Sequence, residues 1–234
     1  MDVLRFEAPA PGEPRPQYPG PGQPGYRPPS EPIVNAPWPV VAMCVAIVVL
    51  YALQRQFPFA EPAFAFSPAR LAKGDTAGLI TSQFLHGNWA HALMNAAFVL
   101  AFGAPVARYF GRGFVGSLAF FAFYLACGVL AALGFAATHW GVNVAMVGAS
   151  GAASGLMGAA ARLIGGHGRP GPMFSQAVTG MGAAWVVINL IMAVTGGALI
   201  PGSGDAGVAW EAHLAGFAAG VLLIGPFGWM SARR

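Results

Sequence analysis

The feature that most constrains this chain is a series of long apolar runs that hold almost no charged residue. The longest run, 114–138, contains no Asp, Glu, Lys or Arg. A membrane-spanning helix needs about 20 mostly apolar residues, with a range of about 17–25. Charged residues make up only 9% of the chain, against about 25% in ordinary soluble domains, so they are too few to coat a water-exposed surface. The sequence therefore excludes a soluble globular protein and predicts an all-α, polytopic membrane protein.

Six runs are long enough to predict six membrane spans. We place them within a membrane domain of residues 37–231, at 38–57, 90–109, 113–138, 146–165, 174–197 and 207–230. The outer loop 58–89 exceeds the length of about 12–15 residues above which loops usually have structure or a function of their own. We expect it to be partly helical and to lie at the membrane interface. On the same side, the Gly-rich stretch 196–207 is expected to be mobile.

The N-terminal residues differ in composition from the rest of the chain. Residues 1–39 hold 12 of the 20 prolines, which remove backbone donors and fix φ. Because this segment has so little to bury, we expect residues 1–36 to form a disordered cytoplasmic tail. No targeting segment precedes the first span, which favours a bacterial inner membrane as the location.

The positive charges indicate how the chain is oriented in the membrane. With six spans and a cytoplasmic N-terminus, both termini are cytoplasmic and nine of the 12 Lys and Arg residues lie on that side. Only Arg55, Arg70 and Lys73 lie on the other side, as the positive-inside rule requires. The net charge of +4 therefore reflects orientation in a lipid bilayer, and we expect no nucleic-acid partner.

Polar residues at membrane depth are costly and mark candidate functional sites. The first group opens the second span and contains His86, His91 and Asn95. His91 and Asn95 are four residues apart, so they share one helix face and form a patch of hydrogen-bond donors. Taken alone, such residues are more often polar contacts between membrane helices.

The second group lies at the start of the fourth span and consists of small residues around a serine. Gly148 and Gly151 flank Ser150 and leave its hydroxyl uncrowded, and Ser154 shares its helix face. The preceding residues, 143–148, are expected to be irregular backbone, which is tolerated only where protein covers it or water reaches it. On its own, this group is more often a packing surface for another helix.

The third group lies in the sixth span. His213 is followed on the same face by Gly216 and Gly220, which let another backbone approach closely. If that backbone is the fourth span, the imidazole comes within bonding distance of the Ser150 hydroxyl. Glu211 points to another side of the helix and is a poor third member of a triad.

Together the three groups meet the needs of acyl transfer. A serine becomes a nucleophile through an adjacent base, and histidine is the usual base. A tetrahedral intermediate needs fixed hydrogen-bond donors, which His91 and Asn95 can supply. All three groups lie toward the outer side of the membrane, so we interpret them as one site.

In order and spacing, these motifs resemble the rhomboid intramembrane serine proteases: H-x4-H-x3-N, then G-x-S-G, then H-x2-G-x3-G. The resemblance covers about residues 38–230 and implies a six-helix core with a Ser–His dyad. By that match Ser150 is the nucleophile, His213 is the general base, and the oxyanion hole consists of His91, Asn95 and the Ser150 N–H. It also implies a structural role for His86 and close helix packing at Gly148, Gly151, Gly216 and Gly220. The substrates would be membrane-embedded proteins cut near the outer face, without metal or cofactor.

Two positions depart from the family pattern. Many members carry a Trp-Arg pair in the first outer loop, whereas residues 74–82 contain no Arg, which leaves the anchoring of that loop in doubt. The residue four positions after the nucleophile is often an aromatic that stacks on the base. Here it is Ser154, which we expect to hydrogen-bond His213 instead.

Two functions of other classes stay open beside the protease. A catalytically silent rhomboid-like protein would bind membrane clients, although the presence of both Ser150 and His213 argues against it. A small transporter would use His and Asn as a polar path, but such proteins typically contain an internal repeat, and none is evident in the sequence.

Overall fold

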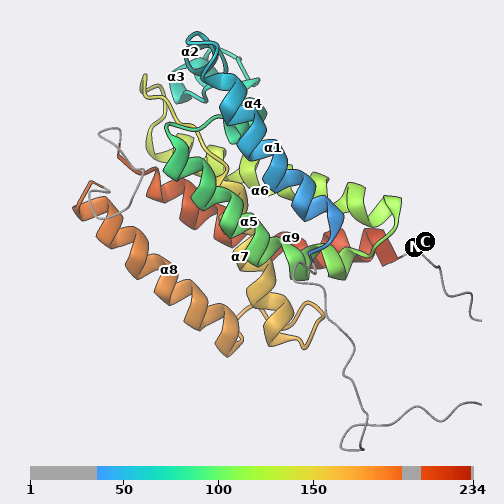
Figure 1. Cartoon of the computed structure of the whole chain (residues 1–234). Helices are drawn as coiled ribbons and strands as arrows, with labels where there is room; N and C mark the ends of the chain where they lie inside the picture. Colours follow the sequence, from blue (N-terminus) through green and yellow to red (C-terminus); the bar gives the residue numbers. More distant parts are fainter. Residues whose placement is uncertain (1–35, 197–206, 233–234) are drawn as a thin grey trace, which may run out of the picture. The chain divides into compact units, whose positions relative to one another are not determined.

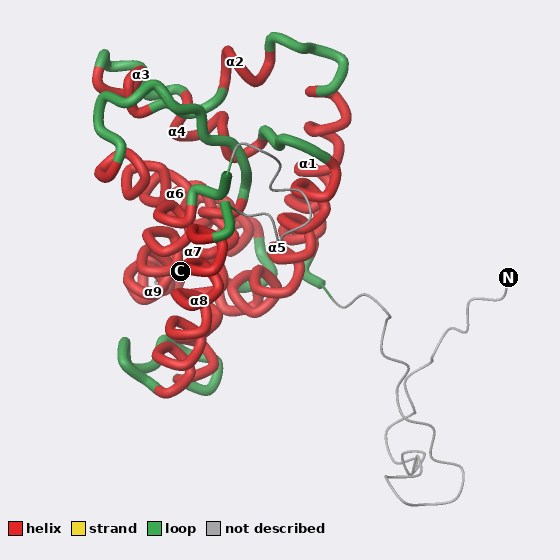
Figure 2. The backbone as a smooth tube through the Cα atoms, turned by 90° about the vertical axis from the view of Figure 1, so that its left-hand side faces the viewer, coloured by secondary structure: helices red, strands yellow, loops and turns green. Residues whose placement is uncertain are grey.

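The computed structural model describes residues 36–196 and 207–232 (Figure 1). The expected proline-rich tail up to residue 35 and most of the 196–207 stretch lie outside the described residues. Within them the chain consists of helices and loops and forms no strand (Figure 2). One isolated antiparallel bridge joins Phe66 and Met146. The prediction of an all-α protein is confirmed for this part of the chain.

Six longer helices coincide with the six apolar runs of the sequence. They are α1 (Trp38–Gln54), α5 (Trp89–Phe110), α6 (Phe114–Thr138), α7 (Ser150–Gly165), α8 (Gln176–Val194) and α9 (Trp210–Ala232). The outer loop is partly helical, as expected, with α2 (Ala60–Phe64), α3 (Pro68–Ala72), α4 (Gly78–Thr81) and the 3₁₀ turn η1 (Ser82–Phe84). The sequence placed the start of the fourth span at residue 146, whereas the helix begins at Ser150.

Four of the described helices are long and apolar enough to cross a membrane: α5, α6, α8 and α9 up to Trp229. Helix α1 is apolar but shorter, with 17 residues. Large apolar side chains on the outside of these helices are exposed, among them Leu118, Val187 and Leu222. Apolar side chains facing outward along several helices fit a lipid environment and would be a liability in water.

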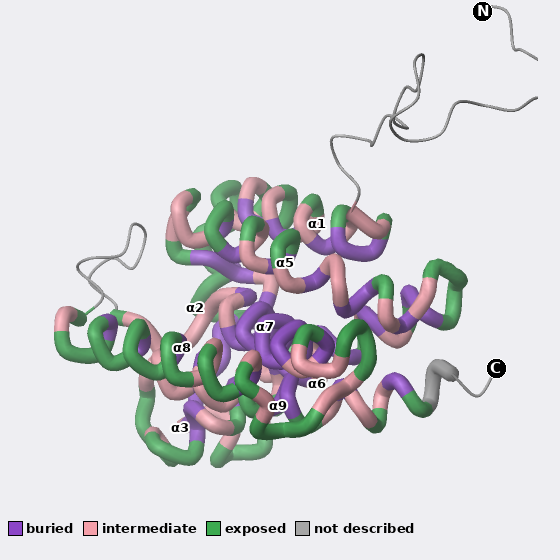
Figure 3. The backbone as a smooth tube through the Cα atoms, turned by 90° about the horizontal axis from the view of Figure 1, so that it is seen from below, coloured by how far each residue is buried: buried purple, intermediate pink, exposed green. Residues whose placement is uncertain are grey.

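Helix α7 has a different environment from the other helices. It packs against α5, α6, α8 and α9, and Figure 3 shows it as a mostly buried segment among them. At about 1.5 Å per residue its 16 residues rise about 24 Å, less than the hydrocarbon core of about 30 Å. Irregular backbone, residues 139–149, precedes the helix and can make up the difference from the hydrocarbon thickness. Such backbone is tolerated at that depth because neighbouring helices cover it. This irregular segment leads directly into Ser150, the first residue of α7.

Glycines bring α7 and α9 into close contact. A Cβ atom at Gly216 would collide with the carbonyl oxygen of Gly151, and one at Gly220 with that of Gly155. Without side chains between them, the two backbones approach closely enough for van der Waals packing along both helices. This contact sets the distance between the side chains at the N-terminal ends of α7 and α9.

Arg70 anchors the outer loop. Its guanidinium donates to the carbonyl oxygens of Pro62 and Ala63, at 3.2 and 3.0 Å, and to the Asp75 carboxylate at 2.8 Å from Nε. The hydrogen bond from Arg70 holds the pKa of Asp75 below its usual range, so the pair stays ionised at neutral pH. The sequence left this anchoring in doubt because residues 74–82 lack an Arg; an Arg at position 70, upstream of that stretch, makes these contacts.

Candidate active site

Ser150 is the first residue of α7, where backbone N–H groups have no acceptor within the helix. The chain reaches it through Gly148, which has a φ of +123° that a residue with a side chain rarely adopts. The Gly148 N–H donates to the carbonyl oxygen of Ser82 at 2.9 Å, and Phe66 and Met146 exchange two backbone hydrogen bonds. The outer loop thus fixes the irregular segment that precedes Ser150.

His213 lies in the first turn of α9 and is buried. Its Nε2 is 2.8 Å from the Oγ of Ser150, so the hydroxyl can donate to the ring. The two residues are 63 positions apart in the sequence and are brought together by the glycine contact between α7 and α9. A serine hydroxyl bonded to an imidazole is the pairing that base-activated nucleophiles require.

The other ring nitrogen of His213 has a partner that the sequence analysis missed. Nδ1 lies 2.8 Å from the Oδ1 of Asn189, a fully buried residue in the C-terminal half of α8. Trp185, one turn earlier in the same helix, places its ring 5.8 Å from the imidazole centroid. The available signal was Asn189 itself, the polar residue within the otherwise apolar run 180–194, which is costly unless it has a partner.

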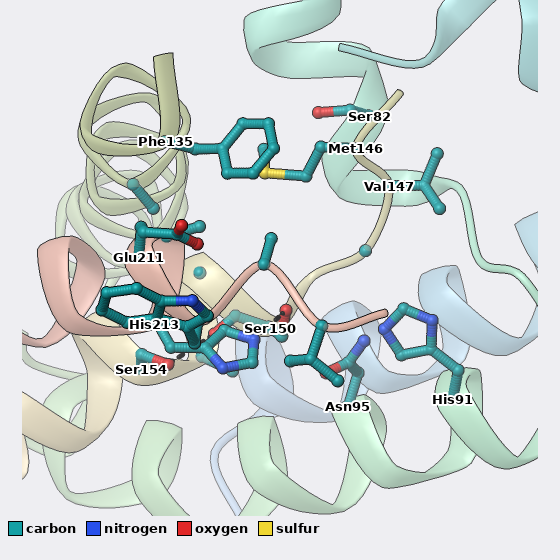
Figure 4. Close-up of a pocket in the computed structure, with 18 of the residues that line it drawn as sticks. Ser82, His91, Asn95, Phe135, Met146, Val147, Ser150, Ser154, Glu211 and His213 are labelled. Atoms are coloured by element: carbon teal, nitrogen blue, oxygen red, sulfur yellow. Dashed lines mark hydrogen bonds between the residues drawn. The ribbon is translucent and has the colours of Figure 1, made fainter. Parts of the chain in front are cut away.

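His91 and Asn95 lie on the opposite side of Ser150 from His213, on α5 (Figure 4). A Cβ atom at Gly148 would be 2.7 Å from Nε2 of His91 and 3.6 Å from Nδ2 of Asn95, so both groups lie against the backbone just before Ser150. The Nδ2 of Asn95 is buried and has no hydrogen-bond partner within the described chain. A buried donor without an acceptor is costly unless a ligand or water supplies one.

His86 is placed behind this site rather than in it. Gln54 of α1 holds its backbone through two hydrogen bonds, one to the carbonyl oxygen at 3.0 Å and one from the N–H at 2.9 Å. The ring is buried against Tyr51 and His91, with centroids 6.2 and 5.1 Å away. Burial, with a smaller effect of His91, lowers the pKa of His86 to about 3, so this imidazole is neutral at physiological pH.

Ser154 does not make the contact that the sequence suggested. We expected it to hydrogen-bond His213, but its hydroxyl donates to the carbonyl oxygen of Ser150, one turn earlier, at 2.7 Å. A serine inside a helix commonly bonds the carbonyl four residues back, and this local partner outcompeted the distant one. Glu211 points away from the ring of His213, as expected, and its carboxylate is 4.0 Å from Nε2 of His139.

These side chains line one cavity of about 940 Å³. Its wall includes Ser150, His213, His91 and Asn95 (Figure 4). Trp185 and Met192 of α8 contribute apolar surface to the same cavity. Among the described residues, no group of three or more His, Cys, Asp or Glu side chains has the arrangement of a metal site. The cavity therefore offers a hydroxyl, a base and hydrogen-bond donors to a bound chain.

Comparison with known families identifies the chain. A family model described as "Rhomboid domain" matches residues 73–229, which is more than half of the 234 residues and includes Ser150, His213, His91 and Asn95. No curated protein sequence gives a significant match. The apolar helices and the matched domain show together that this chain is an integral membrane protein and belongs to the rhomboid family.

Proposed function

We propose that this protein is an intramembrane serine protease that cleaves transmembrane-helix substrates near the outer membrane face. The observation that carries the proposal is the 2.8 Å contact between Nε2 of His213 and Oγ of Ser150 at the wall of a cavity. Membership of the rhomboid family, whose members are generally intramembrane serine proteases, supports the same reaction. No cofactor or metal is required by this chemistry.

The proposed reaction is acyl transfer through two tetrahedral intermediates. His213 takes the proton of Ser150 as Oγ attacks the carbonyl carbon of the scissile peptide bond. His213 then gives this proton to the leaving amine, which departs and leaves an acyl-enzyme on Ser150. Water attacks the ester while His213 takes a proton from it; His213 then returns this proton to Oγ of Ser150 as the second product leaves.

Three donors are proposed to stabilise the negative oxygen of each intermediate. The Ser150 N–H belongs to the first turn of α7, where the helix dipole also favours negative charge. The Nδ2 of Asn95 is buried without a partner, which fits a donor held ready for a substrate oxygen. His91 lies against the same backbone segment and is the third donor.

The proposed topology has six spans with both termini in the cytoplasm. Helices α5, α7 and α9 then all begin at the outer side, which is where His91, Ser150 and His213 lie. The active site opens to the non-cytoplasmic side of a bacterial inner membrane, and water reaches Ser150 from there. A substrate helix must unwind locally, because an intact helix holds its carbonyl groups in hydrogen bonds, so helix-weakening residues are expected near the cut.

Labelling of the detergent-purified protein with a fluorescent fluorophosphonate tests the proposal, because such probes react with activated serines. We expect labelling of the wild type and none of Ser150→Ala or His213→Ala. Ser117→Ala is the matched control, since the hydroxyl of this buried serine donates to the carbonyl oxygen of Gly113, just before its own helix, and does not line the cavity. A folded wild type that is neither labelled nor able to cleave a membrane substrate in liposomes would instead be a silent, client-binding relative.

A further inference from the structure

Asn189 is held in one orientation by the fold. Its side chain is fully buried in the C-terminal half of α8, and its Nδ2 donates to the carbonyl oxygen of Trp185 at 2.8 Å. Only the NH₂ end of an amide can donate to a carbonyl, so this bond assigns the two ends of the side chain. The Oδ1 atom must therefore be the end that faces Nδ1 of His213, 2.8 Å away.

This orientation decides which nitrogen of His213 carries the proton. An amide oxygen can only accept, so Nδ1 must be protonated to bond it. In the neutral ring Nε2 then has a free lone pair and faces the hydroxyl of Ser150 at 2.8 Å. The opposite tautomer would place two acceptors, Nδ1 and Oδ1, in contact and would leave Nε2 unable to take a proton.

The ring has a second contact from the same helix. Trp185 lies 5.8 Å from the His213 centroid at an interplanar angle of 35°. The residue four positions after Ser150 is Ser154, whose hydroxyl is engaged with the Ser150 carbonyl, so α7 provides no aromatic against this ring at that position. Helix α8 thus supplies both a hydrogen-bond acceptor for one edge of the imidazole and an apolar surface beside it.

We propose that Asn189 is a positioning residue that makes the site a Ser150–His213–Asn189 triad. The inference rests on the proposed protease function and adds to it a third member from α8. During attack the Ser150 proton moves to Nε2, while the Nδ1 proton stays on the ring and continues to be donated to Asn189. No proton passes to the amide, which holds the imidazole and, through its dipole, stabilises the imidazolium.

A neutral third member suits the location. A carboxylate at the same place would be an ionised group buried at membrane depth, with a large desolvation cost. An amide supplies the acceptor without that cost, and its NH₂ end is satisfied by Trp185 within α8. Glu211, the carboxylate closest to His213 in sequence, contacts His139 instead and leaves this role to Asn189.

The test compares Asn189→Leu, which keeps the size and removes the acceptor, with Asn189→Asp, which keeps an acceptor. The matched control is Val178→Ala, a buried residue of α8 that packs near Ala161 and Val221 without touching His213. The first readout is the ¹⁵N spectrum of imidazole-labelled protein in lipid, with the His213 signals assigned by their loss in His213→Gln. The second is kcat and KM for cleavage of a transmembrane model substrate in liposomes.

We expect His213 of the wild type to be protonated at Nδ1, and Asn189→Leu to show a mixture of tautomers. Its kcat should fall about 10- to 100-fold with little change in KM; the scale is that of losing the outer hydrogen-bond partner of a metal-bound imidazole, which orients the ring in the same way. Asn189→Asp should retain the Nδ1–H tautomer and more activity than Asn189→Leu, and Val178→Ala should change neither the spectrum nor kcat.

Two results would overturn the inference. One is a wild-type His213 protonated at Nε2; the other is an Asn189→Leu variant whose kcat matches that of Val178→Ala. Either result leaves the proposed protease function standing if the wild type cleaves substrate. A wild type without any activity refutes the protease function instead, and the ¹⁵N spectra then still decide whether Asn189 holds the ring.

Discussion

Substitution of Gly148 by Ala combines two separate costs at the entrance to α7. At a φ of +123° a side chain introduces backbone strain, which is about 1–3 kcal/mol for such conformations. The new Cβ would also lie 2.7 Å from Nε2 of His91, and overpacking of this kind costs about 1–3 kcal/mol. If nothing moves, the loss of stability is therefore about 2–6 kcal/mol. Any relief must come from displacement of His91 or of the backbone before Ser150, which would impair the oxyanion donors.

Gly141 provides a control that isolates the first cost. It has a φ of +75°, but a Cβ there would meet nothing within 4 Å. Gly141→Ala should therefore lose only the strain contribution, about 1–3 kcal/mol, and keep its activity. Reversible unfolding in mixed micelles gives the stability difference, and cleavage in liposomes gives kcat. If the two variants are equally stable and Gly148→Ala keeps full activity, a Cβ at position 148 does not collide with His91, and the second cost is refuted.

Three further predictions concern helix contact, loop anchoring and pH. Gly220→Ala would drive a Cβ into the carbonyl oxygen of Gly155, so α7 and α9 must separate. We expect the free energy of unfolding to fall by about 1–3 kcal/mol and most fluorophosphonate labelling to be lost. Gly225→Ala is the control and should change neither, because a Cβ there meets only Arg162, at 3.8 Å. Arg70→Ala should expose residues 58–89 to faster limited proteolysis than Lys73→Ala, which removes a positive charge from the same segment; equal rates would contradict the anchoring role. Cleavage should decline as pH falls below the pKa of His213, about tenfold per pH unit, because a protonated His213 cannot accept the Ser150 proton. Activity that shows no such decline at any acid pH at which the protein stays folded would argue against this role. His86 should not contribute to that decline, since its pKa is about 3.

The apolar runs were sufficient to predict the helices, because length and the absence of charge are local properties of a sequence. The start of α7 was less predictable, since residues 143–149 are also largely uncharged. Their irregular path depends on the bridge between Phe66 and Met146 and on the bond from Gly148 to Ser82, which join segments far apart in the chain. The hydrophobic pattern alone does not contain this information.

The residues of the candidate site also differ in whether the local sequence or only the folded structure reveals them. Ser150, His213, His91 and Asn95 were predicted as site residues because each belongs to a motif of closely spaced polar and small residues. Asn189 has only apolar residues around it in the sequence, so only the packing of α8 against α9 reveals which ring it faces. Ser154 was misjudged because its bond to the carbonyl of Ser150 competes locally with any distant partner. The loop anchor Arg70 lies upstream of the stretch in which the family pattern suggested an Arg, and its bonds to the end of α2 depend on how the loop folds.

Cleavage of a transmembrane substrate by the purified protein in liposomes is the measurement that tests the central claim most directly. The substrate should be a single-span protein with helix-weakening residues near its outer end, and the products should be identified by mass. We predict cleavage by the wild type and by Ser117→Ala, and none by Ser150→Ala or His213→Ala. Cleavage that persists in Ser150→Ala, or a folded wild type that never cleaves although it binds such helices, would contradict the assignment of Ser150 and His213 as a proteolytic pair.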